Sequence, residues 1–128
     1  MKTLKQVLTI LFGIILILSG VSHLIKPESF FPFIPDFLPK RAINILAGIV
    51  ELGLGVGVFI PRFRSVATFG ILLLMLTLLP IHIIDVFKET PAIGSHQLAL
   101  IRLPVQFVLI VWAWFIYKEV KLKSSLIL

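Results

Sequence analysis

The chain has 128 residues, of which 59% are hydrophobic and only 14% are charged, and its mean hydropathy is +1.11. So few charges cannot cover the apolar surface of a soluble domain of this size, so the composition excludes a soluble module. The sequence contains no cysteine, which excludes disulfide exchange, thiolate metal ligation and a cysteine nucleophile within this chain.

Four apolar stretches predict transmembrane helices over about residues 7–25, 42–60, 66–84 and 98–116. Each stretch is about 28 Å long as a helix, enough to cross a hydrocarbon core about 30 Å thick. We therefore expect an all-α integral membrane four-helix bundle that forms a single domain over residues 1–128. The first stretch follows a basic start, as a signal peptide does, but its length and its small and polar residues favour a retained helix.

The connection over residues 28–40 is rich in proline, and Pro32, Pro35 and Pro39 exclude a regular helix there. Its phenylalanines and aliphatic residues are too apolar for a free loop. We expect an irregular flap that lies over the outer mouth of the bundle. The alternative is that these aromatic residues form only a belt at the membrane interface.

The second and third stretches are joined by a very short turn around Arg62 and must therefore be antiparallel neighbours. Gly53 and Gly57 in the second stretch would allow close approach of another helix, because packing rather than water exclusion holds helices together in lipid. Pro80 in the third stretch predicts a kink.

The lysines and arginines at the helix ends predict the orientation of the chain. Seven lie on the side of the termini and four on the other side, which favours a multi-pass protein of the cell (inner) membrane with both termini in the cytoplasm. These positions also account for the net charge of +6 through contact with the lipid bilayer, without nucleic acid as a partner. The seven are Lys2, Lys5, Arg62, Arg64, Lys118, Lys121 and Lys123.

Polar side chains within the apolar stretches are the main candidates for a site, because such residues are costly in hydrocarbon and usually face a protein interior. There is one in each of the first three stretches and two in the fourth. By helical rise, they lie about 3 to 13 Å below the outer edge of the membrane, all in its outer half. We expect an outward-opening pocket lined by His23, Glu51, His82, Arg102 and Gln106.

Glu51 lies near the midplane and needs a partner, and Arg102 is the best candidate because it is long and always charged. Gln106, four residues from Arg102 on the same helical face, would add a hydrogen bond. Two interpretations remain open. The pair is either a structural ion pair or part of a site that binds the polar head of a lipophilic molecule, with Glu51 as proton acceptor.

The two histidines, His23 and His82, lie at one depth and suggest a metal site with Glu51. Glu51 is about 10 Å deeper by helical rise, so we predict no metal site. His82 and Asp85 form a candidate proton relay between the pocket and water. The alternative is that both histidines only form hydrogen bonds at the headgroup level.

The order of several motifs resembles the DoxX-like family of small four-helix membrane proteins. The motifs are Gly20-x-x-His23, Gly48-x-x-Glu51-x-x-x-Gly55, Leu79-Pro80 and Arg102-Leu103-Pro104-Val105-Gln106, together with the Ile34-to-Pro39 run. The family commonly has Asn where this chain has His82. The resemblance implies the four-helix fold, and some relatives are linked to quinone-coupled sulfur oxidation or to oxidative-stress complexes.

Two classes of function follow from the pocket and the resemblance. The first is a redox-linked subunit that binds a quinone-like lipophilic molecule, with its ring oxygens at Arg102, Gln106 and a histidine. Because the sequence has no haem, flavin or thiol motif, a membrane or redox partner protein would bring any other cofactor. The alternative is a non-enzymatic membrane protein that organises a complex or binds lipid. The sequence leaves open whether the protein is an enzyme.

Overall fold

The computed structural model describes residues 2–127 and the side chains of residues 3–122. The side chains of Lys2 and Lys123, two of the cations that predict the orientation, lie outside this part. Four long helices follow one another: α1 (Lys2–Ile25), α2 (Lys40–Phe59), α3 (Arg64–Phe87) and α4 (His96–Ile127). The described part contains no strand, and the prediction of an all-α four-helix protein is confirmed.

The helices are longer than the apolar stretches that predict them. α1 begins five residues earlier than predicted, α3 continues to Phe87, and α4 continues to Ile127. Hydropathy marks only the part of a helix that fits hydrocarbon, whereas lysine, glutamine and glutamate also favour helix and prolong it into water. The helices therefore extend past both ends of the apolar layer.

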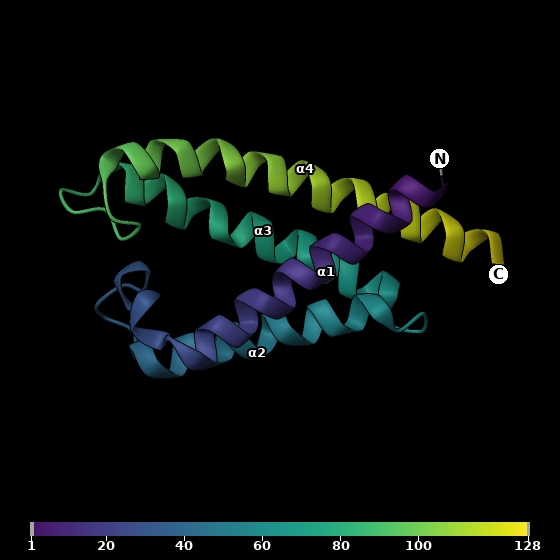
Figure 1. The fold of residues 1–128 in the computed structure, drawn as a ribbon, viewed down its shortest axis with the longest axis horizontal. Helices are drawn as coiled ribbons and strands as arrows, with labels where there is room; N and C mark the ends of the chain where they lie inside the picture. Colours follow the sequence, from purple (N-terminus) through teal and green to yellow (C-terminus); the bar gives the residue numbers. More distant parts are fainter. Residues whose placement is uncertain (1, 128) are drawn as a thin grey trace.

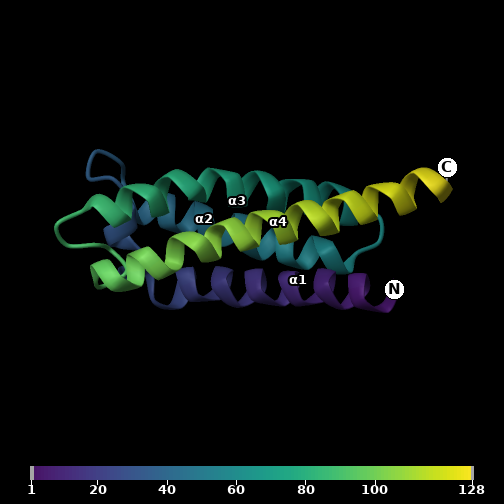
Figure 2. The ribbon, with the colours of Figure 1, turned by 90° about the horizontal axis from the view of Figure 1, so that it is seen from above.

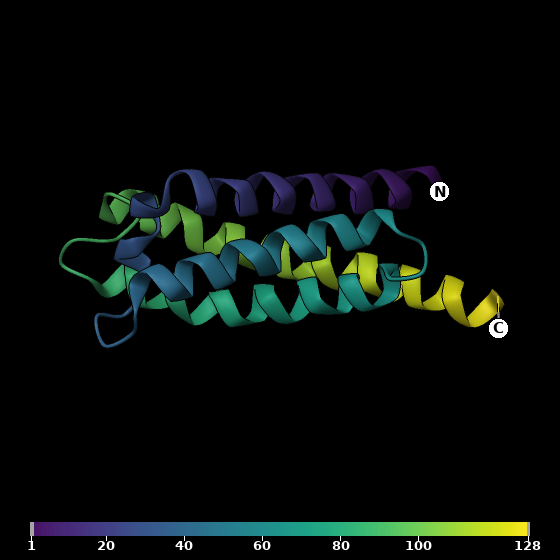
Figure 3. The same ribbon diagram turned by 90° about the horizontal axis from the view of Figure 1, so that it is seen from below.

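The chain folds as two antiparallel hairpins, α1 with α2 and α3 with α4 (Figure 1). Figures 2 and 3 show the four helices running along one long axis, with the start of α1 and the end of α4 at the same end of the molecule. We call this end the terminal end, and the opposite end, which carries residues 26–39 and 88–95, the loop end. Both termini therefore lie on one side of any membrane that the helices cross.

All four helices contribute side chains to the hydrophobic core, which includes Phe12, Val58, Ile71 and Ile116. Trp112 joins α4 to α1: its ring lies edge-on to Phe12 with centroids 4.9 Å apart, and its indole nitrogen donates to the carbonyl of Leu8 at 3.1 Å. A buried indole N–H needs such a partner. This contact fixes the crossing of α1 over α4.

Glycines bring α1 and α2 into backbone contact. A Cβ atom on Gly20 would lie 2.7 Å from the amide nitrogen of Leu52, and one on Gly55 would lie 2.7 Å from the carbonyl oxygen of Gly13. Nothing lies within 4 Å of a Cβ built on Gly53, so this glycine has no such role. The close approach predicted for Gly53 and Gly57 is confirmed only at Gly57, where a Cβ atom would lie 3.0 Å from the Cβ of Ala67 on α3.

The proline-rich connection forms two short 3-10 helices, η1 (Pro27–Ser29) and η2 (Phe31–Phe33), and no α-helix. This agrees with the expectation that its prolines exclude a regular helix. Asp36 and Lys40 then form an i,i+4 ion pair at 2.9 Å before α2. The hydrogen bond from Lys40 holds the pKa of the exposed Asp36 carboxyl below its usual value.

Each long helix has a stretch that is long and apolar enough to cross a membrane. Large apolar side chains cover the outer surface, including Leu18 (63% exposed), Val66 (71%) and Val108 (63%). Water would oppose so large an apolar surface, whereas lipid tails would cover it. The chain is a small multi-pass helical membrane protein.

Candidate functional site

A closed polar network joins α1 to α2 near the loop end. His23 Nε2 lies 2.6 Å from Glu51 Oε2, and the hydroxyl of Ser19 donates to Glu51 Oε1 at 2.8 Å. His23 Nδ1 lies 2.7 Å from Asn44 Oδ1, and the amide of Asn44 donates to the carbonyl of His23 at 2.8 Å. Glu51 and Asn44 are only 7% and 1% exposed, so the network is buried.

The geometry of this network fixes one proton of His23 and leaves two arrangements for the other. The amide nitrogen of Asn44 donates to the carbonyl of His23, so its oxygen faces His23 Nδ1 and accepts a hydrogen bond from Nδ1–H. His23 Nε2 and Glu51 then share one proton, either as imidazolium and carboxylate or as neutral imidazole and carboxylic acid. The pair is neutral overall in both cases, which lowers the cost of its burial in a membrane.

The sequence provides this network through one face of each helix. Asn44, Gly48, Glu51, Gly55 and Val58 are the buried residues of α2, spaced alternately by four and three residues. Ser19 and His23 are four apart on α1. Gly48 allows this face of α2 to lie close to α1, because a Cβ atom at this position would lie only 2.8 Å from the Cβ of His23.

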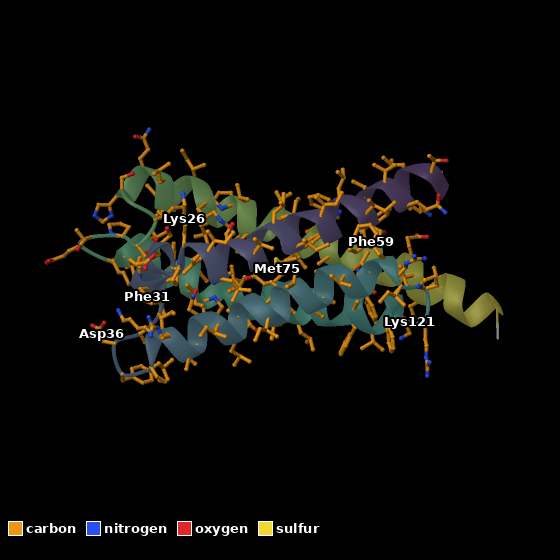
Figure 4. All side chains as sticks on the ribbon, turned by 60° about the horizontal axis from the view of Figure 1, so that its bottom comes forward. Lys26, Phe31, Asp36, Phe59, Met75 and Lys121 are labelled. Carbon is orange, nitrogen blue, oxygen red and sulfur yellow. The ribbon has the colours of Figure 1, made fainter. Side chains whose placement is uncertain are left out.

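A second polar group, Arg102 and Gln106 between α3 and α4, is buried but not fully hydrogen-bonded, and we call it the open pair. Gln106 is fully buried, and its amide nitrogen donates to the carbonyl of Met75 at 2.6 Å, near the middle of the molecule (Figure 4). Its Oε1 atom is buried and has no hydrogen-bond partner among the described residues. The Nη1 atom of Arg102, one turn nearer the loop end, is also buried, and no described residue pairs with it. One unpaired acceptor and one unpaired cationic donor thus lie on one face of α4.

Unpaired polar groups of this kind are unusual in folded proteins, since a buried donor or acceptor without a partner costs about 1–3 kcal/mol. The pair is complementary to a molecule that offers both a hydrogen-bond acceptor, for Arg102, and a hydroxyl donor, for Gln106. Such a molecule must displace side chains to reach the two atoms, because both are covered.

The proline-rich segment contacts His23 and His82 at the loop end. The ring of Phe30 stacks on His23, with centroids 3.7 Å apart, and Phe33 lies edge-on to His82 at 6.0 Å. The ammonium of Lys88 donates to the carbonyl of Pro32 at 3.1 Å. The segment therefore bridges the two hairpins, as expected of a flap.

Asp85 has a structural role that the sequence does not reveal. It is 1% exposed and accepts hydrogen bonds from the backbone amides of Ala92 and Ile93, which anchors the loop between α3 and α4. In the described structure no hydrogen bond joins it to His82. The proton relay through His82 and Asp85 stays a prediction.

The expected pairing of Glu51 with Arg102 is wrong. Glu51 pairs with His23 and Ser19, whereas Arg102 lies in the other hairpin and makes no ion pair with a described residue. Helical rise gives the depth of a residue but not the direction in which its side chain points, and this direction decides the partner.

The five candidate residues accordingly divide into two groups. His23 and Glu51 belong to the closed network, while His82, Arg102 and Gln106 belong to α3 and α4. In the described structure no hydrogen bond or ion pair joins the two groups. The described residues contain no group of three histidine, aspartate or glutamate side chains placed to hold a metal ion. The sequence-based interpretation does not include Ser19 and Asn44. Their spacing of four from His23 and seven from Glu51 nevertheless places them on the same helical faces.

The fold and its apolar spans define the class as small helical membrane proteins with four candidate membrane spans. The chain belongs to the family described as Domain of unknown function (DUF8561), whose family model matches residues 12–117. This match includes every residue of both polar groups. No curated protein and no solved structure matches the chain.

Proposed function

We propose that the protein binds a lipophilic molecule with a polar head, and that the open pair of Arg102 and Gln106 holds this head. The observation that supports the proposal is the presence of two buried polar atoms without partners, Arg102 Nη1 and Gln106 Oε1, four residues apart on α4. A bound head that accepts from Arg102 and donates to Gln106 would remove both costs.

Within this proposal, a quinone-like molecule in its reduced form fits best. A ring hydroxyl both accepts and donates, whereas an oxidised quinone offers acceptors only and would leave Gln106 Oε1 unpaired. The apolar tail would lie against the lipid-facing surface of α3 and α4. Any electron transfer would require a redox partner protein.

The proline-rich flap is the part of the chain that would move to admit the ligand. It lies against His82 through Phe33 and is held to the other hairpin through Lys88. The side chain of Phe33 would then cap the apolar ligand and exclude water.

Two further features belong to this proposal. Kinship with DoxX-like proteins is supported by the order of the motifs, since Gly20, Gly48 and Gly55 within them make the close contacts between α1 and α2. Location in the cell (inner) membrane with cytoplasmic termini is supported by the seven-to-four distribution of lysines and arginines.

The orientation is tested with matched threonine variants. Thr3 and Thr90 are both exposed, at the terminal end and the loop end, and the chain has no native cysteine. In intact cells an impermeant thiol reagent should label Thr90→Cys and leave Thr3→Cys unlabelled. The reverse pattern would place the termini outside.

Ligand binding is tested by purification in mild detergent, followed by mass spectrometry of the extracted small molecules and by titration with a short-chain quinol. Arg102→Met keeps the aliphatic stem but removes the guanidinium, and the exposed Arg41→Met at the same end is the control. We expect wild type and the control to bind the quinol, with at least about tenfold weaker binding by Arg102→Met. Equal binding by both variants would show that Arg102 does not hold the ligand. Co-purified phospholipid alone, without quinol binding, would favour the non-enzymatic alternative that binds lipid.

A further inference from the structure

A cavity lies at the terminal end, opposite to the open pair, and plays no part in the proposed function. It has a volume of about 480 Å³, within the range of roughly 300–1,000 Å³ that small-molecule sites occupy. All four helices or their ends contribute to its wall. Phe59, one of the wall residues, marks this region in Figure 4.

The wall of this cavity has an apolar part and a charged part. Ile10, Val58 and Phe59 provide apolar surface, while Lys5, Arg64 and Glu119 provide charges. Lys5 is already paired with Glu119 at 2.9 Å. Arg64 therefore provides the excess positive charge of the cavity.

Arg64 is oriented by the backbone but keeps most of its donors. Its Nε atom donates to the carbonyl of Val58 at 2.7 Å, which fixes the plane of the guanidinium. Among the described residues, its two terminal Nη groups make no hydrogen bond. A fixed guanidinium with free Nη donors matches the oxygens of a phosphate group.

The surroundings of the cavity also favour an anion. Glu119 is the one acidic residue among the described side chains at the terminal end, where Arg62, Lys118 and Lys121 add positive charge. α3 begins at Arg64 without an acidic residue in its first turn and without a side-chain cap. The N-termini of α1 and α3 and the C-termini of α2 and α4 meet at this end, so their helix dipoles largely offset one another, and the side chains provide the excess positive charge.

We propose that this cavity binds the phosphate headgroup of an anionic phospholipid, with Arg64 as the residue that contacts the phosphate. The position at the ends of membrane-spanning helices places the cavity at headgroup level, and the apolar part of its wall is suited to the glycerol and upper acyl chains. A free phosphate ion would satisfy Arg64 but would leave Ile10, Val58 and Phe59 without a ligand surface. This combination of surfaces is the reason to assign a lipid.

The test measures the thermal stability of the detergent-purified protein with short-chain phosphatidylglycerol, short-chain phosphatidylcholine or inorganic phosphate. Arg64→Gln removes the phosphate contact, and Arg62→Gln is the matched control, since Arg62 is exposed and does not line the cavity. Wild type and Arg62→Gln should be stabilised by phosphatidylglycerol alone. The apparent affinity of Arg64→Gln should be at least about tenfold lower.

A second variant covers the case in which Arg64→Gln fails to fold. Ile10→Trp fills the cavity from a half-exposed position on α1 without changing any charge, and it should also abolish the response to phosphatidylglycerol. An equal response to phosphatidylcholine or to inorganic phosphate would overturn the lipid assignment. An unchanged response in Ile10→Trp, or an equal loss in Arg62→Gln, would overturn the site. None of these outcomes depends on Arg102 or Gln106, so this test and that of the proposed function fail separately.

Discussion

The α1–α2 hairpin and the α3–α4 hairpin each contain polar side chains in a membrane span, but only the first satisfies them. Glu51 has two partners, Ser19 and His23, whereas Gln106 Oε1 and Arg102 Nη1 have none in the part of the chain that the structure describes. A satisfied buried network stabilises one arrangement of two helices, and an unsatisfied one costs stability in the free protein. We infer that the closed network serves the fold and that the open pair is retained for a ligand.

The largest effect should follow from breaking the closed network. Glu51→Leu leaves His23 Nε2 and the Ser19 hydroxyl without a partner, and removal of one member of a buried pair costs about 3–5 kcal/mol. Glu51→Gln should cost about 1 kcal/mol, because its amide can donate to the neutral histidine and its oxygen can still accept from Ser19. Unfolding in detergent with increasing denaturant measures both losses. Equal losses would contradict the shared-proton geometry.

This network also shows how far the sequence predicts the structure. Hydropathy predicts the four spans and proline predicts the irregular flap, because both depend on local chemistry. The partner of Glu51 depends on the rotation of each helix about its axis, which depth does not give. The buried spacing of Asn44, Gly48, Glu51 and Gly55 would have provided this rotation and placed Glu51 against α1. The anchoring of the loop by Asp85 depends on backbone amides and leaves no pattern of residue types.

A smaller effect should follow from separating α1 from α2, since their close approach brings the closed network together. Gly55→Ala adds a Cβ atom that would lie 2.7 Å from the carbonyl of Gly13, and overpacking of this kind costs about 1–3 kcal/mol. Gly53→Ala is the matched control two residues away, where nothing lies within 4 Å, and it should not lower stability. The same denaturant titration compares them. A loss in Gly53→Ala equal to that in Gly55→Ala would show that the effect is not the contact with α1.

The smallest effect should come from the exposed ion pair of the flap, which contrasts with the buried pair of His23 and Glu51. Lys40 lowers the pKa of Asp36, so the pair stabilises the fold above the pKa of Asp36 in the unfolded chain. This contribution is lost as the pH falls through the still lower pKa of the folded state. Titration from about pH 6 to about pH 3 should reduce the stability of wild type slightly more than that of Asp36→Asn. A larger acid loss in Asp36→Asn than in wild type would contradict this sign.

The most direct test of the contrast between the two hairpins is the unfolding free energy of Arg102→Met in detergent, after bound small molecules have been removed. Loss of a buried donor that has no partner should leave the stability unchanged or raise it by about 1 kcal/mol, while Glu51→Leu in the same measurement loses several times as much. This result would assign the open pair to a ligand rather than to the fold. Destabilisation of Arg102→Met as large as that of Glu51→Leu would show that Arg102 is required for folding and would contradict the account.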